Sequence, residues 1–228
     1  MLSPAFPRFQ SGLLAAGLLC LAMPAAAGDY QLAPSADAYV SNEYPNSNYG
    51  DEDKLFVHAG SNTKRSFLRF ELPALAPNEV VTGAALHLFF GQGGNAGTII
   101  DLHHVTTDDW SENAITWANK PVHEAAPLTS ATTLLGNAEM TWNLPLTLFE
   151  SDTDGRISLL LKLADESDND TATFFSKEAA VNPAVPPYLF LHTAPVPEPE
   201  TWAMLLAGLG LLGFRWRRSS HFQNAIPG

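Results

Sequence analysis

The stretch 65–72 reads RSFLRFEL, and its side chains alternate in a way that decides the fold class. Leu68 and Phe70 point to one side of an extended chain, while Phe67 and Arg69 point to the other. The segments 86–90 (LHLFF) and 157–163 (ISLLLKL) share this spacing. A two-residue period is that of a β-strand with one face turned toward a core. The middle of the chain is therefore predicted to consist of strands.

Turn-forming clusters separate these segments: NSNYG at 46–50, GQGGN at 91–95 and DTDG at 152–155. They recur too often to leave room for long helices. About nine short strands favour an all-β fold, an antiparallel two-sheet jelly-roll β-sandwich. The side chains predicted to lie inside it are Leu68, Phe70, Leu86, Leu88, Leu159 and Leu161.

The N-terminal segment 1–27 has the composition of a secretory signal peptide. Arg8 precedes an apolar run that begins at Leu13 and ends at Met23, and three alanines follow at 25–27. This run is too short for a membrane-spanning helix, which needs roughly 20 apolar residues. We expect cleavage by signal peptidase near Ala27, so that the sandwich domain occupies residues 28–194.

The segment 195–218 combines a proline-rich lead, an apolar stretch at 202–214 and a basic cluster, followed by a short tail at 219–228. This order resembles the bacterial PEP-CTERM sorting signal. The resemblance implies processing by an exosortase in a Gram-negative bacterium that makes exopolysaccharide, after transient anchoring in the inner membrane through the C-terminal hydrophobic helix. A plain tail anchor is the alternative. The residues that carry the signal are Pro197, Glu198, Pro199, Arg215, Arg217 and Arg218.

Charge restricts the partners of the domain. Residues 28–197 keep 8 basic and 22 acidic residues, a net charge of −14. An acidic domain of this kind repels phosphate backbones, which argues against nucleic acid as a ligand. It is compatible with divalent cations. An acidic polysaccharide would need a local basic patch or a bridging ion.

Several short blocks occur in the order found in the DNRLRE domain, which the sequence resembles over residues 30–192. The resemblance implies a jelly-roll module of secreted bacterial proteins, often found beside polysaccharide lyases. Some members bind carbohydrate, with alginate-like acidic glycans among the ligands. The blocks are ADAYV at 36–40, PN at 45–46, NYG at 48–50, RSFLRFEL at 65–72, AAL at 84–86, WSE at 110–112, TWANKP at 116–121, SKE at 176–178 and PYL at 187–189.

A carbohydrate site is predicted on the polar sides of the strands 65–72 and 86–90, if these strands share a sheet face. Aromatic rings would stack on sugar rings there, and guanidinium groups would take carboxylates in two parallel hydrogen bonds. In the alternative, Arg69 pairs with an acidic neighbour, and the two phenylalanines lie under a loop. The candidate residues are Lys64, Arg65, Phe67, Arg69, His87 and Phe89.

Trp110 and Trp117 allow two interpretations. Tryptophan is a strong stacking platform for sugars, but in this context the rings are expected to pack a long loop onto the sandwich while their N–H groups find acceptors.

A structural calcium ion is the cofactor that the acidic loops suggest, because calcium takes six to eight oxygen ligands in flexible geometry. The loop at 165–170 offers Asp165, Asp168 and Asp170, and a second acidic run occupies 51–53. Neither run matches an EF-hand. A solvated acidic loop without an ion is the alternative for each.

No enzyme is predicted. The sequence contains no Gly-x-Ser-x-Gly elbow, and nothing marks a particular pair of carboxylates. The chain is expected to be an exported, non-catalytic protein of the cell surface or extracellular polysaccharide matrix that binds carbohydrate. A structural matrix protein without glycan binding is one alternative, and a polysaccharide lyase or hydrolase is the other.

Overall fold

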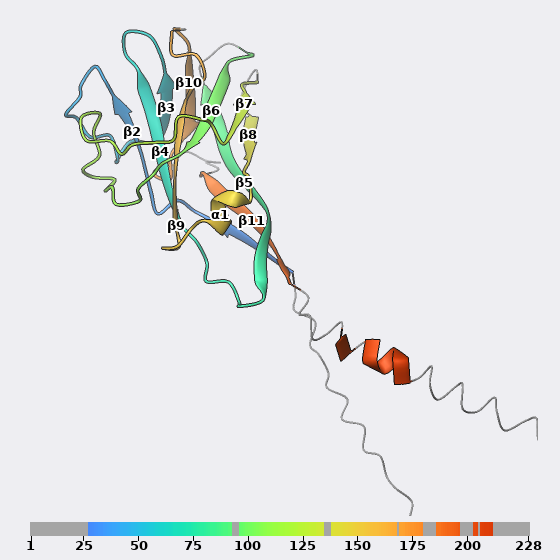
Figure 1. Cartoon of the computed structure of the whole chain (residues 1–228). Helices are drawn as coiled ribbons and strands as arrows, with labels where there is room; N and C mark the ends of the chain where they lie inside the picture. Colours follow the sequence, from blue (N-terminus) through green and yellow to red (C-terminus); the bar gives the residue numbers. More distant parts are fainter. Residues whose placement is uncertain are drawn as a thin grey trace, which may run out of the picture.

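The computed structural model describes residues 27–92, 96–134, 138–167, 169–179, 186–196, 203–204 and 206–211. Strands dominate the chain, as the alternation predicts (Figure 1). They are β1 (Gly28–Leu32), β2 (Ala36–Ser41), β3 (Lys54–His58), β4 (Lys64–Glu71), β5 (Glu79–Gln92), β6 (Ile99–His104), β7 (Thr129–Thr132), β8 (Ala138–Asn143), β9 (Arg156–Leu163), β10 (Thr171–Phe175) and β11 (Tyr188–Pro195). A short helix, α1 (Thr147–Glu150), precedes β9, and the described residues 203–204 and 206–211 of the C-terminal segment are also helical.

Strand pairing is antiparallel and links all eleven strands into one curled sheet, whose two halves we call the first and the second sheet. The first sheet runs β2-β4-β9-β6-β7, and the second runs β1-β11-β5-β10-β3, with β8 on the opposite edge of β5. A single residue pair, His58 with Lys64, links β3 to β4 and so joins the two sheets. The predicted all-β antiparallel sandwich is confirmed.

The main core fills the space between the sheets, with side chains from both of them. The six positions predicted from the alternation are each at most 1% exposed, which confirms the register of the three strands. Trp142 is fully buried in the same core, and its indole Nε1 donates to the carbonyl of Ile100 at 3.2 Å. Such a donor must find an acceptor when it is buried, because an unpaired N–H is costly.

A second apolar cluster lies on the other face of the first sheet. Leu160 of β9 and Phe67 of β4 are fully buried there, although they point away from the main core. The segment 105–128 covers them, and it crosses in front of β2 and β4 in Figure 1. Trp110 of this segment is 8% exposed, and its Nε1 donates to Ser158 Oγ at 2.9 Å. The packing interpretation of Trp110 is therefore confirmed.

The sandwich closes on itself between residues 28 and 195. The first strand, β1, pairs with the last, β11, in a ladder that begins with Gly28 opposite Thr193. Every buried apolar side chain of the described residues falls between Ala36 and Leu191. Within the described residues, no helix is long and apolar enough to cross a membrane. Residues 1–26 of the predicted signal peptide and the six residues that carry the predicted sorting signal lie outside the described residues.

Leu88→Ala should lower the free energy of unfolding by about 2–5 kcal/mol, because it opens a cavity at a site only 1% exposed. Chemical denaturation measures this change. Leu134→Ala is the matched control, since Leu134 is 56% exposed and should change stability by less than about 0.5 kcal/mol. Equal losses in both variants would contradict the register.

Candidate functional site

The predicted carbohydrate platform is not assembled as expected, because its two strands belong to different sheets. In the strand order, β10 and β3 lie between β5 and β4. Arg65 on β4 therefore does not share a face with His87 and Phe89 on β5. Consecutive strands in the sequence need not be neighbours in a sandwich, and here the chain crosses from one sheet to the other.

Phe67 cannot stack on a sugar, because it is 0% exposed and packs at 6.1 Å from the Trp110 ring. This part of the prediction is wrong. The alternative expected from the sequence, a phenylalanine ring that lies under a loop, describes Phe67.

Lys64, another of the predicted residues, places its ammonium over two aromatic rings. The ammonium lies 4.8 Å from the centre of the Phe56 ring and 5.5 Å from that of Tyr39.

Arg69 anchors the crossing segment 105–128. Its guanidinium donates to the carbonyl oxygens of Asp108 at 3.1 Å and of Trp110 at 2.6 Å. It also lies 3.9 Å from a carboxylate oxygen of Glu71, the expected acidic neighbour. The geometry gives Arg69 a structural role, because it holds the crossing segment against β4.

Arg65, one of the six residues predicted to bind carbohydrate, lies close to two lysine side chains. Its guanidinium makes two parallel hydrogen bonds to Glu166, at 2.8 and 2.7 Å, and lies 5.2 Å from the centre of the Trp117 ring. Lys162 on β9 reaches the same carboxylate at 3.9 Å. The pair is only partly exposed, with 16% of the Arg65 side chain and 27% of the Glu166 side chain accessible.

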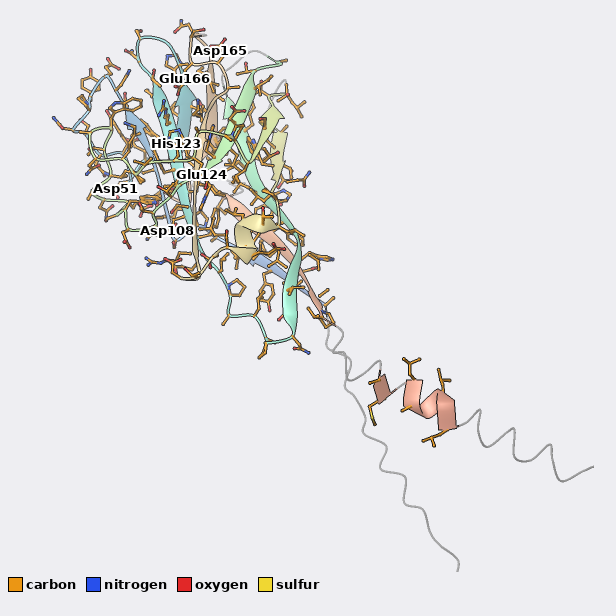
Figure 2. The ribbon with its side chains drawn as sticks, viewed as in Figure 1. Asp51, Asp108, His123, Glu124, Asp165 and Glu166 are labelled. Atoms are coloured by element: carbon orange, nitrogen blue, oxygen red, sulfur yellow. The ribbon has the colours of Figure 1, made fainter. Side chains whose placement is uncertain are left out.

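Lys120 approaches Trp117 from the crossing segment. Its ammonium lies 3.9 Å from the ring centre and donates to the Trp117 carbonyl at 2.8 Å. Trp117 itself is half-buried against the second apolar cluster, so its packing interpretation holds in part. We call this assembly the cationic cluster; it consists of Arg65, Trp117, Lys120, His123, Lys162 and Glu166, of which His123 and Glu166 are labelled in Figure 2.

Electrostatics in the cationic cluster reflect an excess of positive charge. Burial, followed by the charge of Arg65, lowers the pKa of Lys120, and the same two causes lower the pKa of His123. Burial opposes ionisation of Glu166, but the hydrogen bonds and charge of Arg65 outweigh it and lower the pKa of that carboxyl. Three cations thus face one carboxylate. An arriving anion would relieve the repulsion among them.

Sequence reasoning missed Lys120, His123 and Lys162, which come from separate parts of the chain. Lys162 alone carried a signal, because it is the one charged residue in the apolar run ISLLLKL of β9. Lys120 and His123 lie on an irregular segment, where no periodicity indicates which way a side chain points.

His87 and Phe89 form a different surface, on the second sheet. The His87 ring stacks on Tyr188 at 4.5 Å with 5° between the planes, and Phe89 stacks on Phe175 at 5.8 Å. Glu139 accepts from the Tyr188 hydroxyl at 2.6 Å, which raises the pKa of Tyr188 to about 12. We call these four rings the aromatic row. They are half-buried, with some ring surface open to solvent.

The acidic loop proposed for calcium does not gather its carboxylates in the described residues. Asp165 Oδ1 accepts from the backbone N–H and the hydroxyl of Ser167. Asp170 accepts from the Thr171 N–H and from the Thr98 hydroxyl. Asp168 lies outside the described residues. A calcium ion on this loop remains a prediction.

Comparison with known proteins adds two family matches. Residues 28–193 match carbohydrate-binding module family 96, and residues 195–219 match the PEP-CTERM protein-sorting motif. The second match bears out the resemblance of the C-terminal segment to that signal. No protein of curated function matches the chain.

Among solved structures, two adhesin domains of Lys-gingipain from Porphyromonas gingivalis W83 are distantly similar. The K3 domain shares 10% identity over 70% of this chain and 94% of its own, with a TM-score of 0.35. The K1 domain shares 12% identity over 73% of this chain and 98% of its own, with a TM-score of 0.28. The fold assignment stands on the strand pairing and draws nothing from these likenesses.

Glu166→Gln should destabilise the domain by about 1–2 kcal/mol at neutral pH, because it removes a charged, bidentate partner of Arg65. The folded-state pKa of Glu166 is lowered, so the stabilisation is present above the pKa of the unfolded chain and is lost as pH falls through the folded value. Urea denaturation from pH 7 downward should show the difference from wild type shrinking. Glu150→Gln, at an exposed position, is the control. A difference that persisted unchanged in acid would contradict the ion pair.

Proposed function

The chain belongs to carbohydrate-binding module family 96, and we propose that it binds an acidic polysaccharide through the cationic cluster at the cell surface or in the extracellular matrix. The family consists of non-catalytic binding modules, and the C-terminal sorting motif is that of proteins exported to the surface of Gram-negative bacteria. The first match favours carbohydrate binding, and the second favours a place outside the cell.

The observation that carries this proposal is where the positive charge of the domain lies. Residues 28–197 contain eight basic side chains against 22 acidic ones. Three of the eight, Arg65, Lys120 and Lys162, meet around one tryptophan ring and one carboxylate. A polyanion is repelled by the rest of the surface, so this cluster is where it could approach.

The chemistry suits a sugar polymer that carries carboxylate groups. Lysine ammonium groups act as point charges for carboxylates, and a tryptophan ring can stack on the C–H face of a sugar. Glu166 holds the Arg65 guanidinium and the Lys162 ammonium near each other. Arg65 makes two short hydrogen bonds to Glu166, whereas the Lys162 ammonium lies farther from that carboxylate, at 3.9 Å. For this reason, Lys120 and Lys162 would provide most of the attraction. The affinity should therefore fall as salt rises.

The three interpretations of function make different demands on the cluster. A structural matrix protein would need no ligand there. A lyase would release unsaturated oligosaccharides, seen as new ultraviolet absorbance. A binding module would retain polymer without changing it. Retention of the domain by a polymer separates binding from no binding, and the ultraviolet absorbance of that polymer after incubation with the domain detects a lyase.

Export is predicted to involve two cuts, by signal peptidase near Ala27 and by an exosortase after the Pro-Glu-Pro motif. Intact mass of the protein purified from its native cells checks both. The expected mass is that of a chain starting near Gly28 and ending before the basic cluster that begins at Arg215. A mass that includes Met1 contradicts the first cut, and one that includes Gly228 contradicts the second.

Affinity electrophoresis tests glycan binding with the domain spanning residues 28–196. A uronic-acid polymer in the gel should retard the wild-type domain, and a neutral glucan should not. Lys120→Ala and Lys162→Ala should each weaken binding about 3- to 10-fold, because each removes a partly desolvated positive charge. Added sodium chloride should weaken binding of the wild type more than that of a variant that combines Lys120→Ala with Lys162→Ala.

Arg156→Ala is the matched control, since it also removes one positive charge. Its guanidinium lies 3.3 Å from a carboxylate oxygen of Asp154 and 3.8 Å from one of Asp109, where a polyanion is repelled. It should bind like wild type. If all three variants bound alike and Phe89→Ala abolished retention, binding would belong to the aromatic row and the cationic cluster would be excluded. Absence of retention for every polymer would favour the structural matrix protein.

A further inference from the structure

Three carboxylates from distant parts of the chain meet at one edge of the first sheet. Asp37 lies on β2, Glu112 lies on the crossing segment 105–128, and Glu178 follows the end of β10. One ligand oxygen from each lies within 4.8 Å of those of the other two. The three residues occupy the short blocks ADAYV, WSE and SKE of the sequence.

Asp37 is fully buried at this point. Its Oδ2 accepts from the backbone N–H of Lys177 at 2.9 Å, but its Oδ1 has no hydrogen-bond partner among the described residues. Glu178 likewise has a buried oxygen, Oε2, without a partner in the described part of the chain. A buried, unpaired carboxylate oxygen is costly, so these two atoms need either a proton or a cation. Burial raises the pKa of Asp37 to about 8, and a bound cation would take the place of the proton.

Lys177 supplies part of that positive charge. Its ammonium lies 2.9 Å from a Glu112 oxygen and also contacts a Glu178 oxygen. Burial opposes its charged form, but the bonds to these two carboxylates raise the pKa of Lys177. One ammonium among three carboxylates leaves a deficit of two positive charges when all are ionised. A divalent cation would balance it.

We propose that Asp37, Glu112 and Glu178 bind one calcium ion, which contacts the two unpartnered oxygens while Lys177 stays in place. The donors are all oxygen, as calcium prefers, and no imidazole or thiolate from the described residues joins them to favour zinc. Ligands around one calcium lie at about 2.3–2.6 Å from the ion, so oxygens up to about 4.8 Å apart can share it. Magnesium demands a tighter octahedron and keeps its own water, which this buried setting suits less well.

The site would fasten the crossing segment to the sandwich. Glu112 is already held there, since its side chain accepts from the Asp37 N–H at 2.8 Å and its carbonyl accepts from Asn48 Nδ2 at 2.6 Å. At Gly50, any Cβ would lie 2.4 Å from the Glu112 carbonyl oxygen, so the backbone can pass there only as glycine. The same segment carries Trp117 and Lys120. The ion would therefore stabilise the frame of the cationic cluster, whatever ligand that cluster takes.

Thermal unfolding of the domain spanning residues 28–196, after treatment with a chelator, tests the proposal. Millimolar calcium should raise the melting temperature by about 5 to 10 °C at saturation, by preferential binding to the folded state. Sodium at matched ionic strength should give a smaller shift, and magnesium an intermediate one. Isothermal titration calorimetry should give one calcium per chain.

Asp37→Asn and Glu178→Gln should each abolish the calcium-specific shift. Asp165→Asn is the matched control from the other acidic loop and should retain it. If Asp37→Asn does not fold, Glu178→Gln, at one of the two half-buried residues of the cluster, is the deciding variant. Identical melting curves in calcium and sodium, or a calcium response that survives Glu178→Gln, would overturn the proposal. A response lost only in Asp165→Asn would place the ion on the 165–170 loop instead.

Discussion

Burial of β9 on both of its faces is the constraint on which the rest of the structure depends. Leu159 and Leu161 face the main core, while Leu160 between them points the other way and is equally buried. A strand that is apolar on both sides must be covered twice, because each exposed leucine would forfeit roughly 1.5–3 kcal/mol. The second sheet covers one face. The crossing segment 105–128 covers the other, and the Trp110 indole fixes it by its hydrogen bond to Ser158.

The cationic cluster and the carboxylate cluster both form because the crossing segment 105–128 covers this face of the first sheet. Because the crossing segment lies over β4 and β9, Lys120 and Trp117 arrive beside Arg65 and Lys162, which those strands present. The same arrangement brings Glu112 to Asp37. A segment that would otherwise be a long irregular loop thus connects a region of excess positive charge with one of excess negative charge. In a domain of net charge −14, this local separation matters more for recognition than the total does.

The sequence was sufficient for the core but not for the site. Alternation in β4, β5 and β9 located six core positions, because that period reports directly which side chains face inward. It also placed Phe67 correctly on the opposite face, yet it could not show that Trp110 covers that face. Strand order was beyond reach as well, since β4 and β5 are consecutive in the chain but lie in different sheets. In the sequence, the clue to the carboxylate cluster was Asp37, the one charged residue of the segment ADAYVS that forms β2.

Pairing of the first strand with the last has a consequence for how the protein is made. Export threads a chain through the membrane from its N-terminus, so β1 emerges first and waits for β11, its partner some 160 residues later. The long strand β5 waits for β11 too. Contacts this distant in sequence are slow to form, because much chain entropy is lost before they are made. β1 and β5 can therefore take their final places in the sheet only when almost the whole domain, up to residue 195, is available.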